Sequence, residues 1–192
     1  MIARNLFLDE LASVRGPDDV VVFTMSPCNY WPQASPSPLN LFVGGAMGYA
    51  SSVALGLALA APERRVIVLD GDGSLLMNLG TLVTLGHARP SNLVHFVLEN
   101  GLYELTGRVG IPGRGAVDFE AIARGAGLEA TTYDELEPLA GDLPSLLAPD
   151  RPRLVCVRVE PGAREPMQAT DTLRRAPELA HEMTTLLAGA RA

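Results

Sequence analysis

Two short polar segments, each directly after an apolar run, contain the residues of this chain that could do chemistry. Gly71-Asp72-Gly73-Ser74 follows the run RVIVLD, and Glu99-Asn100-Gly101-Leu102-Tyr103 follows the run LVHFVL. Mg²⁺ prefers oxygen ligands in octahedral geometry and often completes its coordination shell with phosphate oxygens and water. Asp72 offers a charged oxygen and Asn100 a neutral one. The pair therefore suits a divalent cation that holds a diphosphate.

Each segment also has a structural interpretation. Asp-Gly most often forms a turn, and Glu99-Asn100-Gly101 could simply end a strand. Gly44-Gly45, before a small-residue segment, serves either packing or a nucleotide loop, but it lacks the Lys-Ser/Thr of a P-loop and the spacing of GxGxxG. The order and separation of the three segments along the chain favour a function.

Composition excludes several classes of protein. The 192 residues suffice for one domain, and 47% of them are hydrophobic. A net charge of −7 argues against a nucleic-acid surface. Cys28 and Cys156 fit no metal-ligand spacing, so we expect reduced thiols in a cytoplasmic protein. The first residues lack a signal-peptide core, and the longest apolar stretch, residues 46–61, falls short of a membrane span.

Apolar runs that alternate with helical segments predict the fold class. We expect strands at residues 20–24, 65–70, 93–98 and 153–159, and helices at residues 2–14, 46–61, 74–86, 119–125, 135–147 and 170–190. In the first helix, Leu6, Leu11 and Val14 are expected on one face. Residues 25–40, with four prolines, and residues 101–115 are expected to be loops. This pattern predicts one doubly wound α/β domain over residues 1–192, with a mainly parallel sheet, helices on both faces, a core at about 20–160 and a helical tail at about 170–190.

In an open parallel sheet, ligands bind beyond the carboxyl ends of the strands. The loop after Thr24 and the two polar segments should meet there. Gly73 and Ser74 would begin a helix, whose free N–H groups favour phosphate oxygens. Asp72 would repel a diphosphate unless a cation lay between them, so this arrangement again indicates a metal.

On these residues the chain resembles the diphosphate-binding domain of thiamine-diphosphate (ThDP) enzymes, over roughly residues 20–159. Their GDG…N signature matches Gly71-Asp72-Gly73 and Asn100, although Glu99 replaces the first residue of the usual Asn-Asn. The resemblance implies that Mg²⁺ is bound by the side chains of Asp72 and Asn100 and by the carbonyl of Leu102. The cofactor-binding residues that it implies are Met25, Ser26, Gly45, Ala46, Met47, Gly71, Asp72, Gly73, Ser74, Asn100, Leu102 and Tyr103.

The segment GGAMG, residues 44–48, also matches this family. There Met47 would lie beneath the cofactor and impose its folded V shape, while the Gly45 carbonyl and the Met47 amide would bond to the aminopyrimidine. The structural alternative for Met47 is an ordinary core methionine.

Longer segments look most like sulfopyruvate and phosphonopyruvate decarboxylases, and this chain is similar to a β-type subunit. Those enzymes tend to read Ser-Thr-Gly-x-Gln after the metal turn, whereas this chain has Leu105-Thr106-Gly107-Arg108-Val109. The substrate, a small 2-oxo acid, is therefore not specified further. Candidates for substrate contact are Tyr103, Thr106 and Arg108, with Tyr30 and Trp31 in the proline-rich segment. Arg108 has a solvated surface position as its alternative, and His87 and His95 are interpreted as structural.

ThDP chemistry needs a glutamate against the pyrimidine ring, and in the family that residue belongs to a separate domain. The resemblance therefore implies a partner chain that supplies the glutamate, a hetero-oligomer of at least α2β2, and a subunit that is inactive alone. Two alternatives remain: a split carboligase of acetolactate-synthase type, and a non-catalytic ThDP-binding assembly module.

Overall fold

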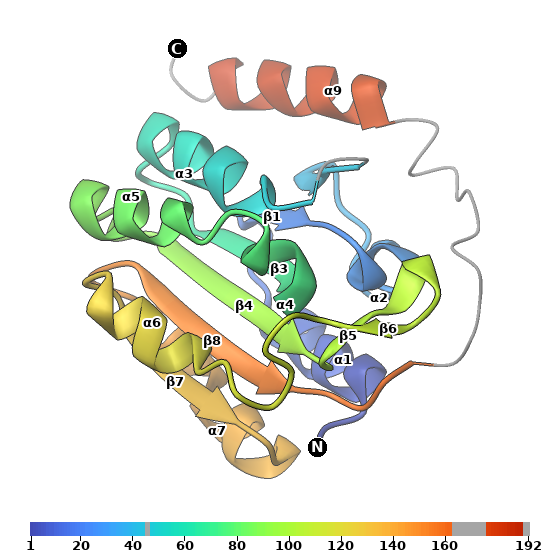
Figure 1. Cartoon of the computed structure of the whole chain (residues 1–192). Coiled ribbons are helices and arrows are strands. Elements are labelled where there is room, and N and C mark those ends of the chain that lie inside the picture. Colours follow the sequence, from blue (N-terminus) through green and yellow to red (C-terminus); the bar gives the residue numbers. More distant parts are fainter. Residues whose placement is uncertain (45–46, 163–175, 190–192) are drawn as a thin grey trace.

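A six-stranded sheet forms the centre of the protein, which a computed structural model describes over residues 1–44, 47–162 and 176–189 (Figure 1). All its strand pairs are parallel, in the order β2-β1-β3-β4-β8-β7. The strands are β1 (Val20–Phe23), β2 (Asn40–Phe42), β3 (Val66–Gly71), β4 (Leu93–Glu99), β7 (Glu129–Tyr133) and β8 (Arg153–Arg158). The expected α/β fold with a parallel sheet is confirmed.

Helices cover both faces of this sheet (Figure 1). One face packs against α1 (Arg4–Val14), α2 (Trp31–Ala34) and α7 (Leu136–Leu146). The other packs against α3 (Ala50–Ala60), α4 (Asp72–Leu76), α5 (Gly80–Ala88), α6 (Phe119–Gly125) and α9 (Ala176–Gly189). Successive residues of β3, such as Ile67 and Val68, are fully buried in opposite layers, as in a strand with helices on both sides.

The buried face of α1 differs from the expected one. Phe7, Leu8 and Leu11 are fully buried, whereas Leu6 and Val14 are exposed. Positions i, i+1 and i+4 share one side of a helix. The observed set of Phe7, Leu8 and Leu11 is more apolar than the expected set of Leu6, Leu11 and Val14. The choice of Leu6 and Val14 was wrong.

The proline-rich segment at residues 25–40 is not a loop throughout. It contains the 3₁₀ turn η1 (Ser26–Asn29) and α2, and it ends as β2 begins at Asn40. Prolines in both short helices occupy the first turn, where no backbone N–H is needed. Trp31 is fully buried, and its Nε1 donates to Asn40 Oδ1 at 3.1 Å, so this part of the segment belongs to the core.

Two expected helices have different bounds. The segment 74–86 is divided into α4 and α5 by residues 77–79, where Asn78 Nδ2 donates to the Gly48 carbonyl at 3.0 Å. The helix expected from residue 46 begins at Ala50, after a turn in which Gly48 has φ +84°. The terminal helix is present as α9, while residues 170–175 and 190 lie outside the described part of the chain.

The glycine-rich stretch at residues 101–115 also contains regular structure. Here β5 (Leu102–Tyr103) pairs antiparallel with β6 (Val109–Gly110), across the 3₁₀ turn η2 (Glu104–Thr106). Among the described residues, no helix combines the length and the apolar character that crossing a membrane requires.

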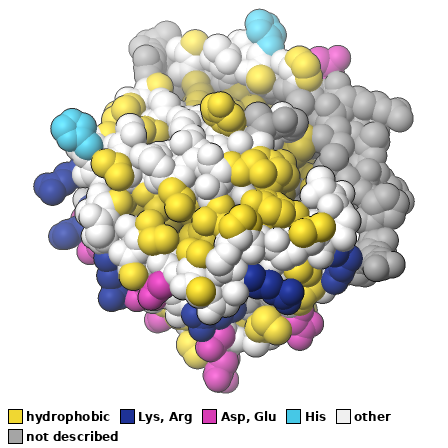
Figure 2. Space-filling view, in the orientation of Figure 1, with side chains coloured by type: hydrophobic (Ala, Val, Ile, Leu, Met, Phe, Trp, Pro, Cys, Tyr) yellow, Lys and Arg dark blue, Asp and Glu magenta, His cyan; other side chains and the backbone are white. Residues whose placement is uncertain are grey.

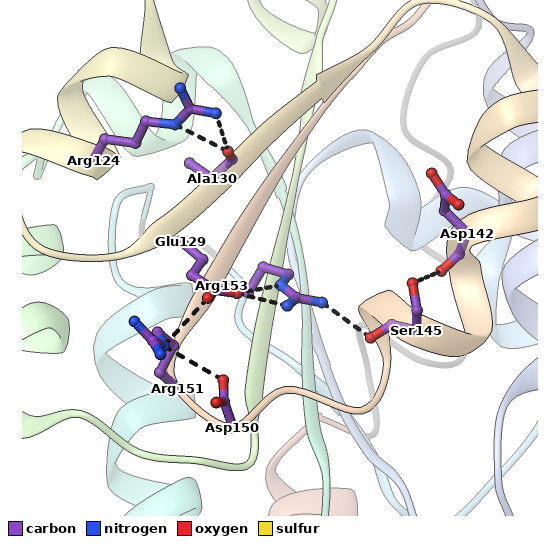
Figure 3. Close-up of polar contacts among 8 residues, drawn as sticks. All are labelled: Arg124, Glu129, Ala130, Asp142, Ser145, Asp150, Arg151 and Arg153. Atoms are coloured by element: carbon purple, nitrogen blue, oxygen red, sulfur yellow. Dashed lines mark hydrogen bonds and ion pairs between the residues drawn. The ribbon is translucent and has the colours of Figure 1, made fainter.

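The edge strand β7 was not expected from the sequence, and polar side chains surround it (Figure 3). The guanidinium of Arg124 donates to the Ala130 carbonyl from Nε at 3.2 Å and from Nη2 at 2.9 Å. On the neighbouring strand, Arg153 pairs with Glu129 at 2.6 Å and donates to the Ser145 carbonyl at 3.0 Å. The Ala130 carbonyl of this edge strand therefore already accepts hydrogen bonds from Arg124. This disfavours pairing of β7 with a strand of another molecule.

Candidate functional site

A cavity lies at the carboxyl ends of the central strands, beside the reversal of strand order between β1 and β3. It is formed by the segment after β1, the β3–α4 junction, the segment after β4, and the end of β8. Its lining residues are Arg4, Met25, Ser26, Pro27, Met47, Gly71, Asp72, Gly73, Ser74, Leu98, Asn100, Leu102, Tyr103, Glu104, Leu105, Thr106 and Val159.

Every described member of the cofactor-binding set lines this one cavity: Met25, Ser26, Met47, Gly71, Asp72, Gly73, Ser74, Asn100, Leu102 and Tyr103. The remaining two, Gly45 and Ala46, lie outside the described residues. Segments far apart in the sequence thus meet as expected, while the role of each residue toward a ligand stays a prediction.

Asp72 stands at the junction of β3 and α4 with only 2% of its surface exposed. Its Oδ1 accepts from the Gly73 N–H at 2.7 Å and its Oδ2 from the Gly101 N–H at 2.6 Å. The carboxylate therefore connects the β3–α4 turn to the turn after β4. Burial raises the pKa of Asp72 above its ordinary value, against the lowering effect of these backbone hydrogen bonds.

No ion pair within residues 1–44, 47–162 and 176–189 includes Asp72. A buried carboxylate without a cation is unfavourable, and a bound cation would remove that cost. Nor does any group of three or more His, Cys, Asp or Glu side chains in the described part form a metal cage. One carboxylate, one amide and room for phosphate oxygens fit Mg²⁺ better than zinc.

Asn100 directly follows β4 and lines the same cavity as Asp72. Its Oδ1 accepts from the Leu102 N–H at 2.8 Å, which fixes the side chain over its own turn. Gly101 has φ +73°, a conformation that glycine adopts without strain. The turn thus places both Asn100 and Leu102 in the lining of the cavity that Asp72 also lines.

Gly73 is in close contact with the ring of Tyr103. A Cβ atom at position 73 would lie 2.5 Å from Tyr103 Cε1 and 3.1 Å from Ile111 Cγ2. A side chain there would displace the tyrosine, so the second glycine of the motif is required by packing. Tyr103 covers the β3–α4 turn from the cavity side.

The turn that carries Met47 is bonded to α4 and to the residues after it. Ser74 Oγ accepts from the Gly48 N–H at 3.0 Å, and Asn78 Nδ2 donates to the Gly48 carbonyl at 3.0 Å. Met47 itself is half-buried and lines the cavity. The predicted contact of Met47 with a cofactor stays a prediction.

A polar cluster in the cavity wall was not expected from the sequence. Glu104 Oε2 lies 2.6 Å from Arg4 Nη1 and accepts from Ser26 Oγ at 2.6 Å, while Oε1 accepts from the Gly162 N–H. Burial alone would raise the pKa of Glu104, but the Ser26 hydrogen bond and the Arg4 charge outweigh it and hold the pKa below its ordinary value. Glu104 thus remains a carboxylate. The Ser26 hydroxyl donates its proton to this carboxylate and cannot donate it to another group at the same time.

No local sequence signal pointed to Arg4. It begins α1, and it reaches the cavity because Ile2 forms a parallel bridge with Val159 after β8. Glu104, by contrast, directly follows Tyr103 and could have been included on position alone.

Other candidates lie away from this cavity. Arg108 Nη1 donates to the Gly162 carbonyl, and Tyr30 Oη donates to Asp9 Oδ1 at 2.7 Å. Trp31 is part of the core, so its selection for substrate contact was wrong. His87 is exposed at the end of α5 and His95 is fully buried in β4, and neither lines the cavity.

Tyr103 and Thr106 do line the cavity, as a substrate contact would require. Glu99, at the position of the first asparagine of the family pattern, lies 3.8 Å from Arg158 of the neighbouring strand.

Known decarboxylases are similar in sequence to this chain. A phosphonopyruvate decarboxylase from Streptomyces viridochromogenes is 44% identical over 125 residues, which cover 65% of this chain and 31% of that protein. The sulfopyruvate decarboxylase subunit beta of Methanocaldococcus jannaschii is 38% identical over 122 residues, which cover 64% of each chain. The chain therefore spans about a third of the first relative and just under two thirds of the second.

A solved structure shares the fold. The thiamine diphosphate-dependent 4-hydroxybenzoylformate decarboxylase of Rhodococcus jostii RHA1 superposes with a TM-score of 0.70 at 28% identity, covering 84% of this chain and 33% of that one. Residues 19–157 match the family described as thiamine pyrophosphate enzyme, C-terminal TPP binding domain. These residues include β1, β3, β4 and most of the cavity wall, and on this match the chain belongs to the family of thiamine pyrophosphate enzymes.

Proposed function

We propose that this chain is the ThDP- and Mg²⁺-binding subunit of a two-chain 2-oxoacid decarboxylase. The observation that carries the proposal is the position of Asp72: a buried carboxylate without a cationic partner in the described structure, facing the same cavity as Asn100. The similarity to phosphonopyruvate decarboxylase and to sulfopyruvate decarboxylase subunit beta supports the reaction class.

In this proposal the Asp72 carboxylate, the Asn100 amide oxygen and the Leu102 carbonyl hold Mg²⁺. The backbone bonds to Asp72 and Asn100 keep both side chains in place before the metal arrives, which lowers the entropy cost of binding. The Ser74 hydroxyl already accepts from Gly48, so its own proton is left to donate to a diphosphate oxygen.

When bound, the coenzyme supplies the electron sink that decarboxylation of a 2-oxo acid requires. The chain positions it and excludes water from it. Apolar side chains, among them Met25, Leu98 and Leu105, form much of the cavity wall. In such surroundings charged groups interact more strongly than they do in water.

The catalytic glutamate is proposed to come from a partner chain. Only two carboxylates line the described cavity wall, Asp72 and Glu104, and each already has a structural role. Exposed apolar side chains close in the chain or in strand pairing to cavity residues offer a surface for such a partner: Tyr49, Met77, and Val109, which pairs with Tyr103. On the face of the molecule drawn in Figure 2, hydrophobic side chains gather across the centre.

Substitution of Asp72 by alanine tests the metal assignment. We expect Asp72→Ala to abolish Mg²⁺-dependent retention of ThDP while the chain stays folded, because the metal loses its only charged protein ligand. Isothermal titration with ThDP, with and without Mg²⁺, measures retention, and circular dichroism checks the fold.

Asp18→Ala is the matched control, since the side chain of Asp18 is 82% exposed and precedes β1, whereas the residues that line the cavity, apart from Arg4, follow this strand. It should bind ThDP as the wild type does. If Asp72→Ala retained ThDP as well as Asp18→Ala, the metal assignment would be refuted.

Product analysis of this chain together with its partner tests the reaction. Release of CO₂ and the aldehyde from a 2-oxo acid supports a decarboxylase. If a carbon–carbon bond forms, and only when an acceptor ketone or aldehyde is added, the enzyme is a carboligase and not a decarboxylase. Binding of ThDP with no turnover of any 2-oxo acid would indicate an assembly module.

A further inference from the structure

The charges in the cavity wall limit which 2-oxo acids can enter. Among the described lining residues three are charged: Arg4, Asp72 and Glu104. Asp72 belongs to the metal position. On this chain's side of the site, the charge available to a substrate is therefore decided by Arg4 and Glu104.

Arg4 and Glu104 neutralise each other. Their charged atoms lie 2.6 Å apart, with 22% and 8% of the respective side chains exposed. Ser26 and the Gly162 N–H also bond to the Glu104 carboxylate, which holds it in this position. A second anionic group on a substrate would have to compete with a carboxylate that is already fixed beside the arginine.

The other arginine considered for anion binding is bonded elsewhere. Arg108 Nη1 donates to the Gly162 carbonyl, and Arg108 does not line the cavity. Much of the remaining cavity wall is apolar and includes Pro27, Leu105 and Val159. These surroundings favour an uncharged side chain on the substrate, because a desolvated charge without a partner is unfavourable.

We infer that Glu104 is a specificity-determining residue: by neutralising Arg4 it restricts the site to 2-oxo acids whose only charge is the carboxylate that is lost. This inference rests on the proposed function and deepens it. It separates this chain's substrate from 2-oxo acids that carry a sulfonate or phosphonate as a second anionic group.

Steady-state kinetics of the holoenzyme, this chain copurified with its partner and loaded with ThDP and Mg²⁺, tests the inference. The probes are pyruvate and 2-oxobutanoate on one side, and sulfopyruvate and phosphonopyruvate on the other. We expect kcat/KM to be at least about tenfold higher for the first pair, since one uncompensated charge at a few Å in a site of intermediate dielectric has at least that effect. A preference for the second pair overturns the inference but leaves the decarboxylase proposal intact. If none of the four 2-oxo acids is turned over, both the inference and the decarboxylase proposal are refuted.

Two variants assign the preference to charge. Glu104→Gln keeps the size of the side chain but leaves Arg4 unneutralised, so the ratio of kcat/KM for sulfopyruvate to that for pyruvate should rise at least about tenfold. Glu104→Asp keeps the charge and should leave this ratio near its wild-type value. Equal ratios in Glu104→Gln and wild type, with both proteins folded by circular dichroism and both retaining ThDP, would show that Glu104 does not select substrates.

Discussion

Gly73 and Tyr103 illustrate how tightly the wall of the cavity is packed at single residues. We expect Gly73→Ala to lower stability by about 1–3 kcal/mol, because the added methyl group overlaps the tyrosine ring and forces it to move. It should also weaken ThDP binding, since Tyr103 lines the cavity. Urea unfolding measures the first effect and titration with ThDP the second.

Gly71 provides the control within the same motif. A Cβ atom there meets nothing within 4 Å, and the backbone is in an extended conformation that any residue adopts. Gly71→Ala should therefore unfold at nearly the wild-type urea concentration. Equal destabilisation by both substitutions would show that the Tyr103 contact is not what requires glycine at position 73.

The sequence was enough to find site residues whose position follows from the adjacent segment of the chain. Asp72 and Asn100 each follow a buried strand, and parallel strands end at a common edge, so their meeting could be predicted. Arg4 could not be found this way, because it reaches the cavity through the bridge between Ile2 and Val159, two residues that are far apart in the sequence.

At the scale of elements, α5 and α6 approach each other where α5 carries Gly86. A Cβ atom at this position would overlap the carbonyl oxygen of Ala126, which ends α6. We expect Gly86→Ala to destabilise the protein by about 1–3 kcal/mol or more, since the obstacle is backbone and cannot rotate away. Thermal and urea unfolding measure this loss.

Gly80, at the start of the same helix, is the matched control. A Cβ atom there has no neighbour within 4 Å. Gly80→Ala should be neutral or stabilise by up to about 1 kcal/mol, because alanine favours helix. The idea of close helix contact fails if Gly86→Ala is tolerated as well as Gly80→Ala.

Prediction of elements failed where tertiary contacts override local pattern. Residues 74–86 read as one helix, but Asn78 bonds to Gly48 and the segment is divided there. Residues 25–40 read as a loop, yet the burial of Trp31 and its bond to Asn40 stabilise short helices. Strand β7 was missed because it is an edge strand with only one buried position, so its sequence lacks a buried-strand pattern.

For the whole molecule, we expect the isolated chain to have no decarboxylase activity even when ThDP and Mg²⁺ are bound. The two carboxylates of the described cavity wall bond to backbone amides or to Arg4, so neither is placed as a proton-transfer group. A CO₂-release assay on the pure chain, with and without its partner, measures this. Robust turnover by the pure chain would disprove the need for a partner.

The bridge between Ile2 and Val159 has a practical consequence for engineering. Val159 lines the cavity and Ile2 bridges to it, so a segment joined to Met1 begins close to the cavity wall. A single-chain enzyme could thus be built by fusing the partner ahead of Met1 through a short flexible linker, with little loss of reach. For the same reason, purification tags are better placed after α9 than before Met1, whose neighbour Ile2 contacts the cavity wall.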